Sequence, residues 1–257
     1  MNSPELLAFD FDGVICDGLI EYFQTAWKAY CLLFNPSDEM PPEGIAEKFY
    51  PLRPVIETGW EMPMLIQALL DGKQAADIVN CWPQMARDYL QAAGLEQVQA
   101  AKTLDGVRDQ WIQSDLSGWL ALHRFYPGMI EKLRSLLTSH LPTYIVSTKE
   151  GRFIEALLAQ NGVDFPRDRI IGKEVKRPKY ETLRLLKVQH GVENIWFIED
   201  RLPALKAVAA QGDLSAVHLF LADWGYNLMP DRATATQDSR IHLLSLEQVV
   251  QEFTYWQ

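Results

Sequence analysis

The sequence lacks the features that mark secreted, membrane-spanning and nucleic-acid-binding proteins. Its three cysteines, Cys16, Cys31 and Cys81, are odd in number and have no metal-site spacing, so we expect free thiols in a reducing compartment. No run of about 18 apolar residues predicts a membrane span, and the N-terminus has no basic region typical of a signal peptide. With 24 lysines and arginines against 34 acids, the net charge of −10 argues against a nucleic-acid surface. These absences predict a cytoplasmic soluble protein with no nucleic-acid or membrane partner.

A long central segment has the period of amphipathic helices and no convincing strand. It runs from about Ile20 to Phe125 and is interrupted by proline, asparagine and glycine breaks. The helices expected there cover residues 21–33, 43–49, 64–70, 74–93 and 95–122. In a chain of 257 residues with an apolar fraction of 48%, this segment predicts an all-helical domain beside a larger core.

Short apolar runs alternate with amphipathic helices in the rest of the chain. The runs cover residues 6–9, 143–147, 169–171, 195–198 and 216–220, and the helices cover 129–138, 152–160, 180–190 and 203–211. This alternation predicts βαβ units and therefore a parallel sheet covered on both faces. The expected fold class is α/β, with a Rossmann-like core domain (residues 1–18 and 125–257) interrupted by an all-α domain (residues 19–124).

Acidic and hydroxyl side chains follow three of the expected strands. They are, in chain order, Asp10, Asp12, Ser147, Thr148, Glu199 and Asp200. In open α/β sheets, ligands bind beyond the carboxyl ends of the strands. Buried carboxylates are costly to cluster unless a cation neutralises them, and hard oxygen ligands suit Mg²⁺ better than zinc. A hydroxyl and a lysine nearby would complete a site for a phosphoryl group.

The segment Asp10–Asp17, DFDGVICD, resembles the opening motif of the haloacid-dehalogenase superfamily. The resemblance implies that Asp10 attacks phosphorus to form an aspartyl-phosphate, while Asp12 acts as general acid and base. It also implies that the Asp10 side chain and the Asp12 backbone carbonyl contact Mg²⁺. Because dehalogenase relatives are not expected to keep an acid two residues after the nucleophile, Asp12 favours phosphate-ester chemistry.

A second segment, Tyr144–Lys149 (YIVSTK), is similar to the superfamily's second motif, a strand that ends in serine or threonine. The resemblance implies that Ser147, followed by Thr148, binds the phosphoryl group. The likeness covers the whole expected core, from residue 1 to about 18 and from 125 to about 245. The helical insertion lies where phosphoglycolate-phosphatase-like members carry a cap domain, which is expected to close over the site and select the substrate.

The lysine of the third motif has more than one candidate in the stretch 173–179, KEVKRPK. Lys179 opens the expected helix with a spacing similar to that of phosphoserine phosphatases, and it is the favoured candidate. Arg177 stands where a phosphoglycolate-phosphatase-like pattern would place lysine. Lys176 is the third alternative.

The segment Phe197–Asp200 (FIED) is similar to the acidic motif that holds Mg²⁺. Asp200 is the expected ligand, and Glu199 is expected to support it in the inner or outer shell because Ala204 stands where a second aspartate would be. A later segment, Asp223–Tyr226 (DWGY), also resembles one common in phosphoglycolate-phosphatase-like members.

The sequence therefore predicts a Mg²⁺-dependent phosphatase of a small phosphorylated metabolite, acting as a monomer or a homodimer. A phosphomutase with the same nucleophile is an alternative, and it would yield an isomer with little free phosphate. A catalytically silent relative that binds a phosphate ligand or a partner protein is a third hypothesis, which predicts stabilisation by ligand without turnover.

Overall fold

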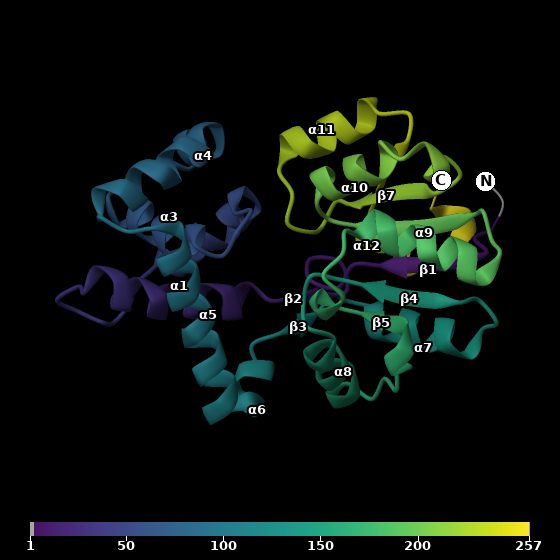
Figure 1. Ribbon diagram of the computed structural model, residues 1–257, viewed down its shortest axis with the longest axis horizontal. Helices are drawn as coiled ribbons and strands as arrows, with labels where there is room; N and C mark the ends of the chain where they lie inside the picture. The colour runs from purple at the N-terminus through teal and green to yellow at the C-terminus, as the bar shows by residue number, and fades with distance from the viewer. Residues whose placement is uncertain (1–2, 257) are drawn as a thin grey trace. The chain divides into compact units, whose positions relative to one another are not determined.

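The computed structural model describes residues 3–256, which form two compact units. The α/β unit comprises the residues up to Asp17 together with those from Arg124 onward, and the helical unit comprises Gly18–His123 (Figure 1). The boundaries expected from the sequence, after residues 18 and 124, lie one residue beyond these. Each unit is therefore described by itself.

Six strands of the α/β unit form one parallel sheet in the order β5-β4-β1-β6-β7-β8. They are β1 (Leu6–Phe9), β4 (Thr143–Val146), β5 (Ile170–Ile171), β6 (Ile195–Glu199), β7 (His218–Ala222) and β8 (Ile241–Leu244). Central β1 pairs with β4 and β6, so that Phe9 lies opposite Ile145 on one side and Ile198 on the other. All of β1 is buried, because a strand covered on both faces must be apolar throughout.

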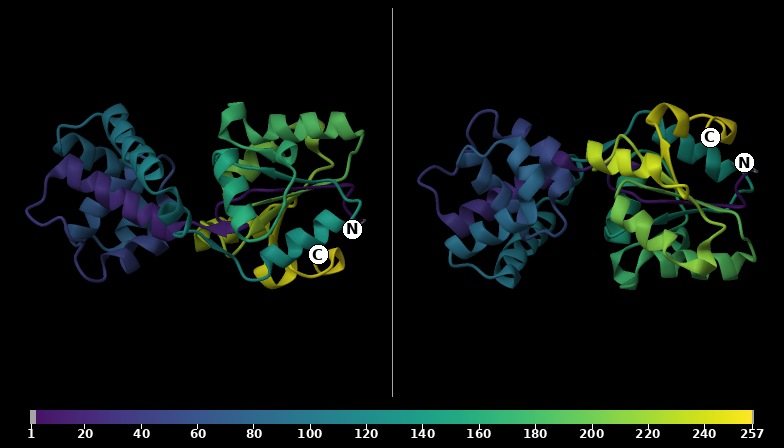
Figure 2. Two further views of the ribbon diagram at one scale, coloured as in Figure 1. Left: turned by 90° about the horizontal axis from the view of Figure 1, so that it is seen from below. Right: turned by 90° about the horizontal axis from the view of Figure 1, so that it is seen from above.

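Helices cover both faces of this sheet. They are α7 (Met129–Thr138), α8 (Gly151–Gln160), α9 (Lys179–His190), α10 (Leu202–Ala209), α11 (Met229–Gln237) and α12 (Leu246–Val249). Figure 2 shows α9 (green) on one side of the sheet, and α7 (teal) and the C-terminal segment (yellow) on the other. On the first face Ala8 and Phe197 belong to one apolar cluster with Leu183 of α9. On the second face Trp196 and Trp256 pack with ring centroids 5.5 Å apart.

Strand β8 and helix α11 are among the elements of the α/β unit that were not expected from the sequence. Strand β8 is an edge strand in which His242 and Leu243 are half-buried, so it lacks a continuous apolar run. Helix α11 buries one residue, Ala235, and has little amphipathic pattern. Both elements depend on the sheet beside them, which explains why local periodicity misses them.

A short antiparallel pair lies where the chain leaves the α/β unit and returns to it. Strand β2 (Cys16–Asp17) pairs with β3 (Arg124–Phe125), with Cys16 opposite Phe125. This pairing brings the two ends of the insertion together, so the long helical segment enters and leaves at one place in the α/β unit.

The helical unit contains α1 (Leu19–Phe34), α2 (Ile45–Phe49), α3 (Glu61–Leu70), α4 (Ala75–Ala92), α5 (Gln97–Ser114) and α6 (Leu116–Leu120), with a 3-10 turn at Tyr50–Val55. Its own core includes Trp27, Ile66, Trp82 and Leu104. Among the described residues, no helix is both long and apolar enough to cross a membrane.

The single helix expected at residues 95–122 is wrong, because the chain breaks at Asp115. That residue has an extended φ of −153°, and its side chain accepts a hydrogen bond from the Gly118 backbone N–H at 2.8 Å. An aspartate that caps a new helix competes with continuation of the old one, and the periodic pattern alone does not reveal that competition.

Candidate active site

The candidate site lies at the carboxyl ends of the three central strands. Asp10 directly follows β1, Ser147 directly follows β4, and Glu199 is the last residue of β6. Because β1 lies between β4 and β6, the parallel register brings these ends to one edge of the sheet. The backbone N–H of Asp10 donates to the Ile198 carbonyl at 2.8 Å. This bond extends the hydrogen-bonded pairing of β1 with β6 as far as Asp10.

Three buried acids converge at this edge. Oxygen atoms of Asp10, Glu199 and Asp200, one from each carboxylate, all lie within 4.8 Å of one another. The exposed fractions of the three residues are 6%, 0% and 1%. Burial raises the pKa of Asp10 to about 7, where the charge of Lys179 opposes the shift and that of Glu199 adds to it. Burial, followed by the charges of Glu199 and Asp10, likewise raises the pKa of Asp200 well above its usual value.

Lys179 is the cation that reaches these acids. It is the first residue of α9, and its Nζ lies 2.9 Å from Asp10 Oδ1 and 2.6 Å from Glu199 Oε2. Burial lowers the pKa of the Lys179 ammonium, but the charges of Asp10 and Glu199 outweigh burial and raise the pKa. Lys179 therefore remains charged and offsets part of the repulsion in the cluster.

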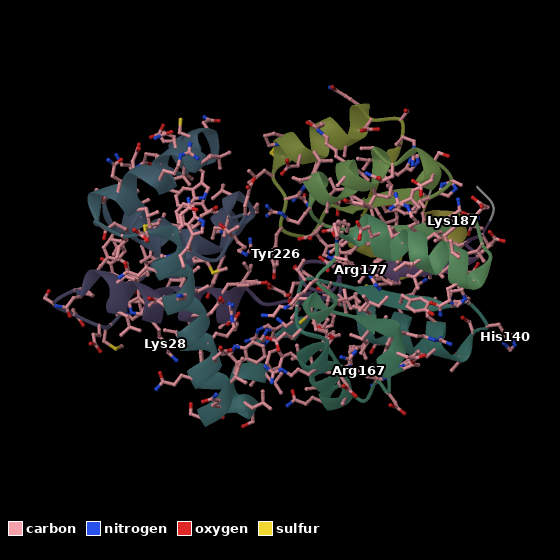
Figure 3. The ribbon with its side chains drawn as sticks, in the orientation of Figure 1. Lys28, His140, Arg167, Arg177, Lys187 and Tyr226 are labelled. Carbon is pink, nitrogen blue, oxygen red and sulfur yellow. The ribbon has the colours of Figure 1, made fainter. Side chains whose placement is uncertain are left out.

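The other two cationic candidates face elsewhere. Arg177, labelled in Figure 3, is exposed and donates from Nε to the buried hydroxyl of Thr182 at 3.0 Å. Lys176 is exposed and has a left-handed backbone with φ of 50°. Of the three alternatives left open by the sequence, Lys179 is the one whose ammonium contacts the acids.

Glu199 uses both of its oxygens within the protein. Oε1 accepts hydrogen bonds from the backbone N–H groups of Asp200 and Arg201 at 3.1 and 2.9 Å, and Oε2 accepts from Lys179. Burial would raise the pKa of Glu199, but the charge of Lys179 and these hydrogen bonds lower it overall. The side chain therefore orients the turn after β6 and holds Lys179 in place.

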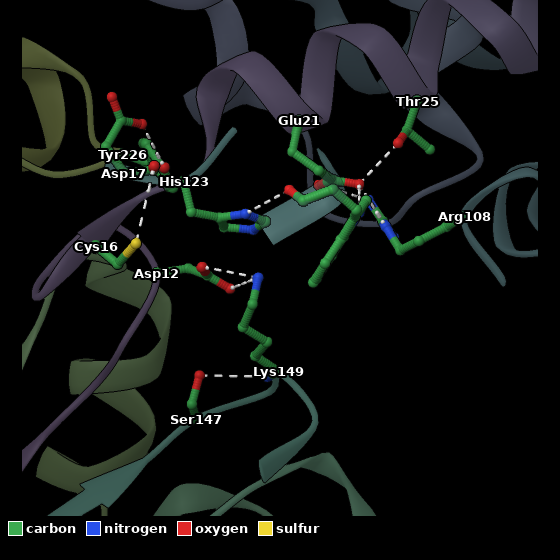
Figure 4. A network of polar contacts seen from close by, with 11 residues as sticks. Asp12, Cys16, Asp17, Glu21, Thr25, Arg108, His123, Ser147, Lys149 and Tyr226 are labelled. Atoms are coloured by element: carbon green, nitrogen blue, oxygen red, sulfur yellow. Dashed lines mark hydrogen bonds and ion pairs between the residues drawn. The ribbon is translucent and has the colours of Figure 1, made fainter. Parts of the chain in front are cut away.

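Asp12 and Ser147 lie on loops beside the cluster, and a lysine not singled out from the sequence joins them (Figure 4). The Lys149 ammonium lies 3.2 Å from Oδ1 and 3.4 Å from Oδ2 of Asp12. Ser147 is 7% exposed, and its Oγ accepts the Lys149 backbone N–H at 3.2 Å. Thr148 lies between them in the chain, and its side chain is exposed. Lys149 is the last residue of the second motif, YIVSTK, but nothing in that motif predicted its contact with Asp12.

The loop after β7 supports Asp200 from a distant part of the chain. The backbone N–H of Tyr226 donates to Asp200 Oδ2 at 2.7 Å, and the Tyr226 hydroxyl donates to Asp17 Oδ1 at 2.8 Å. The Asn227 side-chain amide donates to the Asp200 carbonyl at 3.0 Å. The likeness in the DWGY segment was the sequence signal for this loop, although it did not reveal the contact with Asp200.

Two glycines allow the close approach of these segments. Gly13 has φ of +83°, and a Cβ there would lie 2.0 Å from Asp200 Oδ2. A Cβ on Gly225 would lie 2.3 Å from the Asp200 Cβ and 2.4 Å from the Gly13 carbonyl oxygen. Side chains at either position would displace Asp200, so both glycines are required by the packing of the site.

Solved structures with the same architecture identify the fold. A predicted phosphoglycolate phosphatase from Haemophilus somnus aligns with a TM-score of 0.59 and 18% identity over 88% of each chain. A haloacid dehalogenase-like family hydrolase from Streptococcus pneumoniae aligns with a TM-score of 0.55 and 16% identity, over 98% of this chain and 99% of that one. The chain has the haloacid dehalogenase-like fold.

A third structure of this kind, a predicted phosphatase from Clostridium acetobutylicum, has a TM-score of 0.57 and 14% identity over 97% of each chain. No protein-family model and no curated protein matches the sequence. At these identities the structural likeness establishes the fold, a Rossmann-like core with a helical insertion, and leaves the chemistry to be argued from the residues.

The acid cluster fits a divalent cation. Asp10 Oδ1 is buried, and the Lys179 ammonium that lies 2.9 Å from it is shared with Glu199. A buried oxygen of this kind is costly unless a further positive group engages it. Lys179 pairs with two of the three carboxylates, and the oxygens of all three are the donors that Mg²⁺ prefers.

Proposed function

We propose that the chain is a Mg²⁺-dependent phosphatase that hydrolyses a small-molecule phosphate monoester through an aspartyl-phosphate on Asp10. The observation that carries this proposal is the cluster of three buried acids, in which one ammonium, that of Lys179, contacts both Asp10 and Glu199. The haloacid dehalogenase-like fold supports the proposal, because Asp10 follows the first strand, as in the nucleophile motif that the sequence resembles.

In the first step, an Asp10 carboxylate oxygen attacks phosphorus. The bond between phosphorus and the ester oxygen breaks, and its electron pair goes to the leaving oxygen, which takes a proton from Asp12. Lys179 and the Ser147 hydroxyl are placed at the same sheet edge, where they would orient the phosphoryl group and offset its charge.

In the second step, water releases the phosphoryl group. Asp12 takes a proton from the water, the water oxygen bonds to phosphorus, and the bond between phosphorus and Asp10 breaks. Inorganic phosphate leaves, and the Asp10 carboxylate is restored. Asp12 thus returns to its starting protonation state, so both steps balance over one turnover.

Asp10 and Asp200 are the side chains that would hold the cation. Glu199 would act from behind them, because its two oxygens already accept hydrogen bonds from protein groups. The bound cation would supply positive charge that keeps the clustered carboxylates ionised and stabilises the developing charge on phosphate oxygens. The Tyr226 backbone N–H fixes one Asp200 oxygen and so defines which one remains for this role.

The test is phosphate release from a panel of small phosphate esters, with Mg²⁺ and with chelator. Wild type should release phosphate only with Mg²⁺, and Asp10→Asn should lower the rate at least about a thousand-fold, since the neutral amide is a far weaker nucleophile. Asp213→Asn is the matched control, because Asp213 is an acid on the surface paired with Arg184.

Comparable release by Asp10→Asn would sink the mechanism. Formation of an isomeric phosphate with little free phosphate would favour the mutase alternative instead. Stabilisation by phosphate esters without any turnover would favour the binding-only alternative.

A further inference from the structure

Helix α11 contributes little to the apolar core, yet it makes polar contacts with the loop that reaches Asp200. Of its nine residues, all within the part of the chain that the structure describes, Ala235 alone is buried. Arg232, the fourth residue of this helix, is half-buried. Its Nε donates to Asn227 Oδ1 at 2.7 Å, and its Nη2 donates to the Asn227 backbone carbonyl at 3.4 Å. Arg232 therefore connects α11 to the loop that follows β7.

Asn227 is 5% exposed, and both ends of its side-chain amide have partners. The amide nitrogen donates to the Asp200 carbonyl at 3.0 Å and to the Ala222 carbonyl at 2.8 Å. The amide oxygen accepts from Arg232. A side-chain amide has two N–H donors and one carbonyl oxygen, so these contacts use both donors and leave the oxygen to the guanidinium. Asn227 thus joins the carboxyl ends of β6 and β7 to α11.

The orientation of the Asn227 amide is fixed from both sides. A guanidinium only donates hydrogen bonds, so Arg232 requires the amide oxygen to face α11 and the amide nitrogen to face the strand ends. With the amide turned over, its oxygen would face the carbonyl oxygens of Asp200 and Ala222, which is costly in a buried place. Without Arg232, the amide oxygen would lose its charged donor, and rotation of the amide away from the strand ends would cost less.

The same loop holds Asp200 at two points. The Tyr226 backbone N–H donates to Asp200 Oδ2 at 2.7 Å, and the Asn227 amide donates to the Asp200 carbonyl. Because Tyr226 and Asn227 are neighbours in the chain, a shift of one moves the other. The direction in which Asp200 presents its carboxylate to the proposed cation therefore depends on this loop. Mutation of the groups that orient metal ligands typically changes metal affinity by about 10–100-fold.

We propose, on the basis of the function proposed above, that Arg232 is a positioning residue for the cation site. By hydrogen-bonding the Asn227 amide, Arg232 holds the loop that fixes Asp200. The sign of its charge supports a geometric role. A positive charge opposes the binding of a further cation, so any help that Arg232 gives to Mg²⁺ comes from the geometry that it imposes.

Two replacements of Arg232 separate the hydrogen bond from the charge. Arg232→Gln and Arg232→Met both remove the charge, but glutamine keeps an N–H donor at the same number of bonds from Cα as the arginine Nε, where methionine has a methyl group. The probe is Mg²⁺ alone, titrated calorimetrically into the full chain. Arg232→Met should raise the Mg²⁺ dissociation constant about ten-fold, and Arg232→Gln should stay within about three-fold of wild type.

Arg134→Met is the matched control. Arg134 lies on α7, and its guanidinium also donates to a loop, at the carbonyls of Asn161 (2.6 Å) and Gly162 (3.4 Å). This loop follows α8 and contains none of the three clustered acids. Arg134→Met should therefore leave the Mg²⁺ dissociation constant unchanged.

A double variant tests whether Arg232 acts through Asn227. Asn227→Ala should weaken Mg²⁺ binding at least as much as Arg232→Met does, and adding Arg232→Met to it should change the dissociation constant less than about two-fold. Additive losses would overturn the route through Asn227. If Asn227→Ala does not fold, the comparison of Arg232→Gln with Arg232→Met decides by itself.

The outcomes also separate this proposal from the proposed function. If wild type binds Mg²⁺ and Arg232→Met binds it equally well, the positioning role is overturned and the metal-dependent function stands. Equal weakening by Arg232→Gln and Arg232→Met likewise overturns the positioning role alone, because the hydrogen bond would then not matter. If wild type binds no Mg²⁺, both proposals fail together.

Discussion

Both units of the protein contain buried carboxylates, but the number of donors around each carboxylate differs between the two units. In the helical unit, Glu21 of α1 is 1% exposed and accepts hydrogen bonds from three side chains. They come from Thr25 at 2.7 Å, from Arg108 at 2.7 and 3.2 Å, and from Trp119 at 3.1 Å. Figure 4 shows Thr25 and Arg108 beside Glu21.

In the α/β unit, by contrast, three buried acids lie together, and one ammonium, that of Lys179, pairs with two of them, Asp10 and Glu199. Burial lowers the pKa of Arg108, but Glu21 more than offsets that and raises it, as expected of a complete ion pair. For Asp10, the effect of burial is larger than that of the Lys179 charge, and the pKa of Asp10 is raised to about 7. Removing one partner of a fully hydrogen-bonded buried ion pair is costly, whereas a cluster of buried acids with a single cation is a candidate site for a ligand.

The largest effect on stability is expected from Glu21→Ala. Its loss leaves the Arg108 guanidinium and the Trp119 indole N–H without their carboxylate in a buried setting, so unfolding free energy should fall by about 3–5 kcal/mol. Chemical denaturation followed by tryptophan fluorescence measures this. Glu47→Ala, at an exposed position on α2, is the control. If the two variants lose similar stability, Glu21 does not hold these helices together.

Mg²⁺ is expected to stabilise the folded protein by binding the acid cluster of the α/β unit. At about a hundred times its dissociation constant, it should stabilise wild type by about 2.7 kcal/mol, because it binds the folded acid cluster. Above pH 7 in chelator, Asp10→Asn should be more stable than wild type, because burial raises the pKa of Asp10 to about 7 and the ionised form is the costly one. This variant should also gain less from Mg²⁺. Thermal melts with and without Mg²⁺ give both values. A gain as large in Asp10→Asn as in Asp213→Asn would place the cation elsewhere.

The smallest effect is expected from Tyr226→Phe. This change removes the hydroxyl that donates to Asp17 and should cost about 1 kcal/mol of unfolding free energy. The response to Mg²⁺ should persist, because the Tyr226 backbone N–H, not the hydroxyl, holds Asp200. Loss of that response in a folded variant would show that the hydroxyl contributes to the acid site as well.

Local sequence patterns predicted most of the sheet because its strands are buried on both faces. The run at residues 6–9 coincides with β1, and the runs at 143–147 and 195–198 differ from β4 and β6 by one residue at one end. Local sequence patterns did not predict edge strand β8 or the helix break at Asp115. The middle of β8 is half-buried, and a cap depends on one side chain, so neither leaves a periodic signal.

The sequence by itself determined which side chains stand at the carboxyl ends of the strands, because strand ends and acidic residues are both local features. The approach of Asp10, Glu199 and Asp200 then required the strand order that places β1 beside β6. The sequence favoured Lys179 over Lys176 and Arg177 without excluding them.

Tertiary structure alone decided which cation meets which acid, since the Lys149 and Asp12 side chains are 137 positions apart in the chain. It also decided that the Tyr226 backbone supports Asp200. The physical reason is that periodicity reports the face on which a side chain lies, whereas an ion pair or hydrogen bond depends on a few ångströms between segments that only the folded chain brings together.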